Sequence, residues 1–97
     1  MNKREIEERG YKWFPAPSIK EYISNNWQKR FRDEEGNTLY FITIYEYTFN
    51  VRGEVSVGYE AEIQLYQKET RNALNLQFLD GWYLEDIEQI AEKIYTS

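Results

Sequence analysis

Turn signals between alternating segments are the feature that most constrains this fold. From Trp27 to Leu79 apolar and polar side chains alternate with the period of two that is typical of β-strands. Asp33–Gly36 and Asn50–Gly53 both place Asp or Asn first and glycine fourth, which suits a type I turn followed by a left-handed glycine. A four-residue loop at Lys68–Arg71 completes the division into four strands. We therefore predict a four-stranded antiparallel meander of order 1-2-3-4.

Loops of three residues after Asp33 and Asn50 predict the strand register. They place odd-numbered positions of the first three strands on one strongly apolar face, and the four-residue loop adds the fourth strand to that face. A two-residue loop at Arg52-Gly53 would turn one strand over and break this match. The predicted cross-strand pairs are Phe31 with Leu39, Phe49 with Val55, Tyr47 with Val57, Tyr45 with Tyr59, Phe41 with Ile63, Leu39 with Leu65, Leu65 with Leu74, Ile63 with Leu76 and Ala61 with Phe78.

Helices are predicted on both sides of the strand segment. Ser18–Glu21 fits a capping box, so a short helix should follow and end near Asn25-Asn26. Trp82–Tyr95 has an apolar stripe at helical spacing, with acidic residues near its positive end. Both helices should cover the apolar sheet face, which gives an α+β fold.

The N-terminal part of the chain is predicted to contribute little to the core. Residues 1–10 are charged, with Ile6 as the only large apolar residue after Met1, and they are interpreted as a tail or a frayed helix. Tyr11–Pro17 should be extended, because each proline biases its predecessor away from the helical region. Residues 11–97 are predicted to form a single domain.

Catalytic equipment is scarce in this sequence. The chain of 97 residues contains no histidine and no cysteine, the commonest ligands of catalytic metals, and it is 18% aromatic. Glu60 and Glu62 lie about 7 Å apart by strand rise and are interpreted as a solvated strand face rather than a glycosidase pair. Asp33–Asn37 departs from the calcium-loop pattern and is interpreted as an acidic turn. We predict a non-catalytic protein without a cofactor or metal site.

Charge and hydropathy limit the classes of partner. A net charge of −5 at pH 7 repels polyphosphate on average, so nucleic acid is not the expected partner. No apolar run approaches the roughly 18 residues that a membrane span needs. We therefore predict a cytoplasmic protein that binds a protein partner and no membrane.

Two surfaces are candidates for that binding. On the sheet face opposite the apolar one, the predicted register places the basic pair Arg30 and Arg32 beside Tyr40 and Ile42, and the acidic pair Glu60 and Glu62 follows. Arg30 lies opposite Tyr40 in this register, as a cation–π pair. The second candidate is an aromatic arm, because the two middle strands are longer than their neighbours. The arm either packs into its own core or binds another chain, including a second copy. The predicted partner-binding residues are Arg30, Arg32, Tyr40, Ile42, Glu60 and Glu62 on the face, and Tyr45, Tyr47, Phe49 and Tyr59 on the arm.

Two resemblances add to this interpretation. The order helix, antiparallel strands, helix resembles the double-stranded RNA-binding domain, but Glu85–Glu92 is acidic where that family needs lysines. In size, acidity and lack of catalytic residues the chain is similar to small phage or mobile-element proteins that inhibit a host defence enzyme, and to bacterial immunity proteins. That likeness implies a stoichiometric protein-binding role. The alternative function is a single-stranded nucleic-acid binder that uses Arg30, Arg32 and Tyr40.

Overall fold

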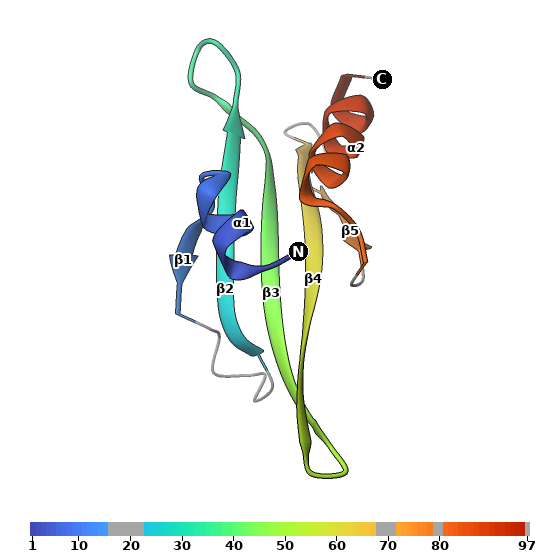
Figure 1. Cartoon of the computed structure of the whole chain (residues 1–97). Helices are drawn as coiled ribbons and strands as arrows, with labels where there is room; N and C mark the ends of the chain where they lie inside the picture. Colours follow the sequence, from blue (N-terminus) through green and yellow to red (C-terminus); the bar gives the residue numbers. More distant parts are fainter. Residues whose placement is uncertain (16–22, 68–71, 79–80, 97) are drawn as a thin grey trace.

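A computed structural model describes residues 1–15, 23–67, 72–78 and 81–96 (Figure 1). Its elements are α1 (Lys3–Glu8), β1 (Lys12–Phe14), β2 (Ile23–Arg32), β3 (Thr38–Val51), β4 (Glu54–Gln67), β5 (Asn72–Phe78) and α2 (Leu84–Thr96). The strands form one antiparallel sheet of order β1-β2-β3-β4-β5. The predicted α+β meander, with a short N-terminal helix and a C-terminal helix, is confirmed. Strand β1 adds an edge strand that was not predicted.

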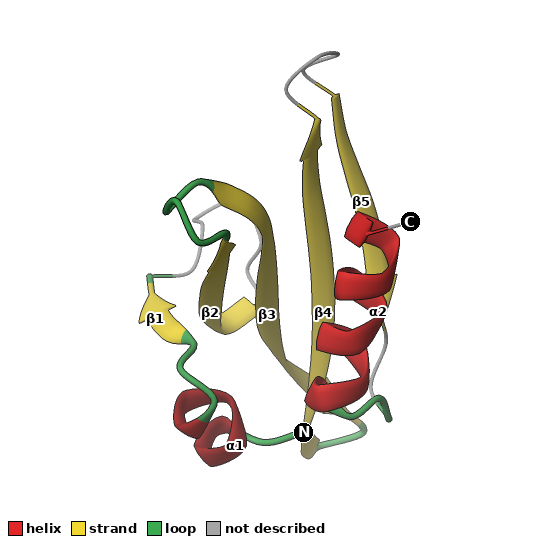
Figure 2. Ribbon diagram, turned by 90° about the horizontal axis from the view of Figure 1, so that it is seen from above, coloured by secondary structure: helices red, strands yellow, loops and turns green. Residues whose placement is uncertain are grey.

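The core lies between one face of this sheet and the two helices, which are on the same side of it (Figure 2). The apolar stripe of α2 packs there as predicted. The prediction that residues 1–10 supply little core is wrong, because the side chain of Ile6 in α1 is fully buried. Asn2 caps that short helix by accepting a hydrogen bond from the Glu5 amide at 2.9 Å. The buried cluster contains Ile6, Tyr11, Trp27, Tyr40, Ile42, Ile44, Ala61, Ile63, Leu84, Ile87 and Ala91.

The turn between β3 and β4 differs from the prediction by one residue. Val51 pairs with Glu54, so the loop is Arg52-Gly53, and these two residues have φ angles of 53° and 84°. Two successive positive φ angles are typical of a type I′ turn, whose twist matches the flanking strands. The predicted three-residue loop is therefore wrong. As a result β3 is turned over relative to the predicted register, and its even-numbered positions face the core.

The first turn has the predicted form, but a bulge follows it. The Asp33 amide donates to the Asn37 carbonyl at 3.0 Å, and Gly36 has a φ of 87°, as expected for a three-residue loop with a left-handed glycine. A register shift between Phe31 and Arg32 then pairs Phe31 with Tyr40 instead of Leu39. This shift keeps the apolar side of β2 in phase with the even-numbered side of β3. The last predicted pairs, Leu65 with Leu74, Ile63 with Leu76 and Ala61 with Phe78, are confirmed.

The predicted helix after the capping box is wrong where the structure describes it. Ser18–Tyr22 lie outside the described residues, whereas Asn25 and Asn26 are in β2. The Asn25 side chain accepts from the Trp13 indole at 2.8 Å and donates to the Glu46 carboxylate at 2.8 Å. These contacts with the neighbouring strands outweigh the local helix signal.

Asp33 gives the first turn a pH-dependent stability. Its carboxylate accepts hydrogen bonds from the Asn37 and Glu35 amides at 2.8 and 2.9 Å, which lower the pKa of Asp33. A lowered folded-state pKa stabilises the fold above the unfolded value of about 3.9, and this stability is lost as the pH falls through the folded value. We expect Asp33→Ala to melt below the wild type at pH 7, and the gap to narrow at pH 2. Thermal melts followed by circular dichroism, with Glu34→Ala as the matched control, would show a constant gap if the carboxylate is not the cause.

Candidate protein-binding surfaces

The sheet face away from the helices, here called the open face, carries a band of aromatic side chains from β3 between charged side chains of β2 and β4. The strand register defines it, because Arg30 pairs with Phe41 and Phe41 pairs with Gln64. Basic residues come from β2 and acidic residues from β4, so the predicted change of charge across this face is present. The open face contains Gln28 and Arg30 from β2, Phe41, Thr43, Tyr45, Tyr47 and Phe49 from β3, and Glu60, Glu62 and Gln64 from β4.

Two predicted members of this face lie elsewhere. Tyr40 and Ile42 are buried in the core, with exposed fractions of 6% and 0%. The predicted Arg30–Tyr40 pair is wrong as well: the Arg30 guanidinium lies over the Phe41 ring, 5.2 Å from its centroid. Tyr40 instead stacks against Phe31 with ring centroids 4.7 Å apart. The two-residue turn at Arg52-Gly53 is the physical reason, because it exchanges the two faces of β3.

Hydrogen bonds fix the aromatic band to the acidic strand. The Tyr47 hydroxyl donates to Glu60 at 2.8 Å, and the Tyr45 hydroxyl donates to Glu62 at 3.4 Å. Glu62 is only 9% exposed and also accepts from the Gln64 amide at 2.8 Å, so it is not the solvated carboxylate that was predicted. Burial, together with the negative charge of Glu62, raises the pKa of Tyr45. Tyr45 is therefore a neutral donor, and the two hydroxyls hold both carboxylates in place.

The hairpin tip, residues 48–57, projects past both helices (Figure 1). Strands β3 and β4 have 14 residues each, against 10 in β2 and 7 in β5, which confirms the predicted overhang. The prediction that Tyr59 shares a face with Tyr45 and Tyr47 is wrong. Its hydroxyl donates to Glu46 at 2.9 Å on the helix side. Four large apolar side chains of the tip are exposed, namely Phe49 (44%), Val51 (59%), Val55 (68%) and Val57 (51%).

These apolar side chains occupy both faces of the tip. Phe49 and Val51 alternate along β3 and continue the open face, and Phe49 stacks on Tyr47 with centroids 6.0 Å apart and an interplanar angle of 12°. Val55 and Val57 pair with Asn50 and Thr48, so they project from the opposite face. The tip is a two-stranded ribbon with an apolar surface on each side.

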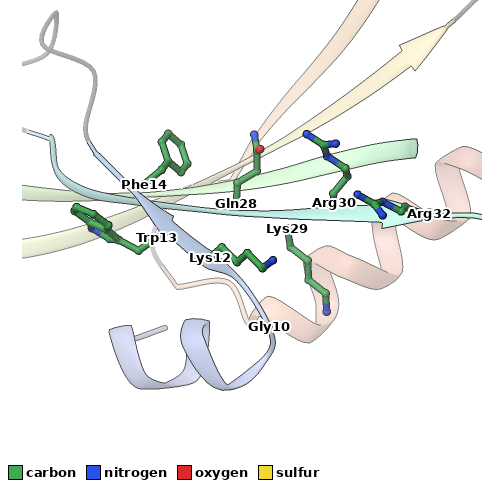
Figure 3. A pocket seen from close by; sticks show the side chains of 8 residues that line it. All are labelled: Gly10, Lys12, Trp13, Phe14, Gln28, Lys29, Arg30 and Arg32. Carbon is green, nitrogen blue, oxygen red and sulfur yellow. The ribbon is translucent and has the colours of Figure 1, made fainter. Parts of the chain in front are cut away.

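A basic pocket of about 640 Å³ lies where β1 and the end of α1 meet β2 (Figure 3). Sequence reasoning predicted Arg30 and Arg32 as binding residues, but it missed Lys12, Trp13 and Phe14. Their only signal was an aromatic pair in the extended segment before Pro15, because nothing local showed which strand they would join. The pocket is lined by Gly10, Lys12, Trp13, Phe14, Gln28, Lys29, Arg30 and Arg32.

One partly buried carboxylate connects the helices with the sheet. Glu88 of α2 accepts hydrogen bonds from the Arg9 guanidinium and, at 2.9 Å, from the Tyr11 hydroxyl. Lys29 lies 3.9 Å from the same carboxylate and also donates to the Arg9 carbonyl at 2.8 Å. Burial and the Glu88 charge raise the pKa of Tyr11. These contacts hold α2 against the α1–β1 segment and have a structural role.

Within the described ranges, no group of three or more acidic side chains is arranged to hold a metal ion. In the same part of the chain, no helix is long and apolar enough to cross a membrane. No protein-family model, curated protein or solved structure matches this sequence.

Proposed function

We propose that this chain is a non-catalytic protein-binding protein whose hairpin tip inserts into a cleft of its partner. The observation that supports this proposal is the exposure of four large apolar side chains on the tip. Contiguous exposed apolar surface of this kind marks interaction sites. Burial of one such side chain contributes about 1.5–3 kcal/mol.

The distribution of these side chains indicates how a partner would bind. A partner that covered only the face of Phe49 and Val51 would leave Val55 and Val57 in water. A cleft that surrounds the tip buries both faces at once. The open face continues from Phe49 through Tyr47 and Tyr45, whose rings lie within 6.5 Å of each other by centroid distance. This face can contact the rim of the cleft through Glu60.

The proposed mode of action is stoichiometric. A protein of this kind blocks or masks its partner by occupying a cleft, in the manner of phage-type inhibitors and immunity-like proteins, and it acts in the cytoplasm. A second copy of the chain is one partner that the tip could bind, since two exposed apolar ribbons can bury each other. Light scattering of the purified protein would detect that dimer directly.

Substitution of the tip tests the proposal. Val55→Thr and Val51→Thr keep a β-branched side chain of similar shape and add a hydroxyl, so strand propensity changes little. We expect each to weaken partner binding about tenfold, which corresponds to about 1.4 kcal/mol, and to leave the melting temperature unchanged. Tagged wild-type protein would capture the partner from host cells, and calorimetry with the purified partner would measure the affinity.

The matched control is Ser56→Ala, which alters an exposed residue of the same tip that pairs with Phe49. It should bind like the wild type. Equal affinities of the wild type, Val51→Thr and Val55→Thr would place the interface outside the tip. A fall in melting temperature with unchanged affinity would show that the tip packs within its own domain.

A further inference from the structure

We infer that the basic pocket beside β1 binds single-stranded nucleic acid, a function separate from the protein binding proposed for the hairpin tip. Among the residues that the structure describes, the pocket is lined by four cationic side chains, two aromatic side chains, Gln28 and Gly10, and none of these lining residues is a carboxylate. In a chain with a net charge of −5, this is a local concentration of positive charge. Its cations are Lys12, Lys29, Arg30 and Arg32.

Most of this charge is available to a ligand. The ion pairs of the described residues include Lys29, which shares Glu88 with Arg9, but they do not include Lys12, Arg30 or Arg32. Each of these three side chains belongs to an exposed residue. The Arg30 guanidinium is positioned over the Phe41 ring, so its orientation is fixed while its charge is not neutralised.

The cations lie in a row rather than around a single point. Lys12 is in β1, whereas Arg30 and Arg32 are two positions apart in β2, about 7 Å by strand rise. A single small anion would need these side chains to converge on it. A row along an open strand edge suits a chain that carries one charge per unit, as a nucleic-acid backbone does.

The aromatic side chains favour nucleic acid over an acidic peptide. Trp13 is 54% exposed, and its ring is held by the indole hydrogen bond to Asn25 at 2.8 Å. Phe14 rises on the same side of the strands as Arg30, whereas Trp13, which pairs with Trp27, lies on the other side with Lys29 (Figure 3). Exposed rings beside cations can stack on unpaired bases, whereas the bases of a duplex are already stacked. An acidic peptide would use the cations and leave the rings without a planar partner.

This site differs from the alternative predicted from the sequence. That alternative combined Arg30 and Arg32 with Tyr40, which is buried in the core. The structure keeps both arginines and replaces the tyrosine by Trp13 and Phe14, which reach the pocket because β1 pairs with β2. The pocket is thus formed by two segments that are separated in sequence.

Binding can be measured by the fluorescence anisotropy of a labelled thymidine oligonucleotide of about 12 residues, within the usual range of site sizes. Contacts of Lys12, Arg30 and Arg32 with phosphates predict a slope of about −2 for the logarithm of the affinity against that of the salt concentration. Arg30→Glu combined with Arg32→Glu should weaken binding at least about tenfold. Arg4→Glu, a single charge reversal of the same kind on an exposed residue of α1, should have no effect.

Substitution of Trp13 separates the contribution of base stacking to the affinity from the contribution of charge. Trp13→Ala should weaken binding about tenfold without changing the salt slope, while Trp13→Phe should retain most of the affinity. The inference is overturned if a duplex of the same length binds as tightly, if polyglutamate displaces the oligonucleotide at equal charge, or if the double arginine variant binds like the wild type. Val55→Thr should bind the oligonucleotide normally, so loss of the tip and loss of the pocket are distinguishable.

Discussion

Trp27→Ala should lower the free energy of unfolding by about 3–5 kcal/mol. Trp27 is the largest fully buried side chain, and it belongs to the core cluster between the sheet and the two helices. Its removal leaves a cavity that the β2–β3 pair cannot close, because Trp27 pairs with Ile44 in the middle of the ladder. The loss also frees the Glu7 carboxylate, which accepts the indole hydrogen at 3.4 Å. Since domains are stable by about 5–15 kcal/mol, the variant should be near its unfolding threshold.

Urea denaturation followed by circular dichroism would measure this change. Trp82→Ala is the matched control, because it removes the same side chain from a position that is 44% exposed. The control should lose about 1 kcal/mol or less. Equal losses for the two variants would show that Trp27 is not the centre of the core.

Ile6→Ala should lower the free energy of unfolding by about 2–5 kcal/mol, although Ile6 lies in a helix of six residues. Alanine is the better helix former, so helix propensity would favour the variant. The expected loss therefore reports the core contact alone. Ile6→Val, which removes one methylene group, should cost about 0.5–1.5 kcal/mol.

Lys3→Ala serves as the control for this helix, because Lys3 is exposed and precedes Ile6 by one turn. It should unfold at the same urea concentration as the wild type. If Ile6→Ala also does so, the first ten residues are the dispensable tail that their composition suggested. The slope of the urea transition should be the same in every variant that keeps the native fold.

The sequence determines the register best where only one side of a strand is apolar. In β4, Ala61 and Ile63 alternate with Glu60 and Glu62, so the pairing with β5 was predicted correctly. A slip by one residue would have placed carboxylates against the helices. The difference in free energy between the two registers is large, so the alternation of apolar and acidic residues predicts the correct one.

Strand β3 gives no such information, because both of its sides are apolar. Phe41 and Tyr45 on one side alternate with Ile42 and Ile44 on the other. The register then depended on the length of the turn before β4. Asn50–Gly53 suits either a three-residue loop or a two-residue loop, and only a positive φ at Arg52, which is unusual for a residue other than glycine, distinguishes them. The placement of Tyr40 and Ile42 at a binding surface failed for this reason.

The candidate surfaces were predictable where they depend on strand length and not where they depend on distant pairing. The overhang of β3 and β4 follows from the lengths of the alternating segments, and Phe49 was correctly placed on it. The basic pocket requires β1, a strand of three residues whose pairing with β2 no local pattern encodes. Its cations therefore appeared in the sequence as separate charges.

The position of Glu88 has a consequence for the order in which this chain can fold during synthesis. Its carboxylate binds Arg9 and Tyr11, which precede it by 79 and 77 positions. The ribosome makes residues of the N-terminal segment first, yet their ionic partner lies in the last helix. The contact between Arg9 and Glu88, which joins α2 to the α1–β1 segment, therefore forms only after α2 has been synthesised.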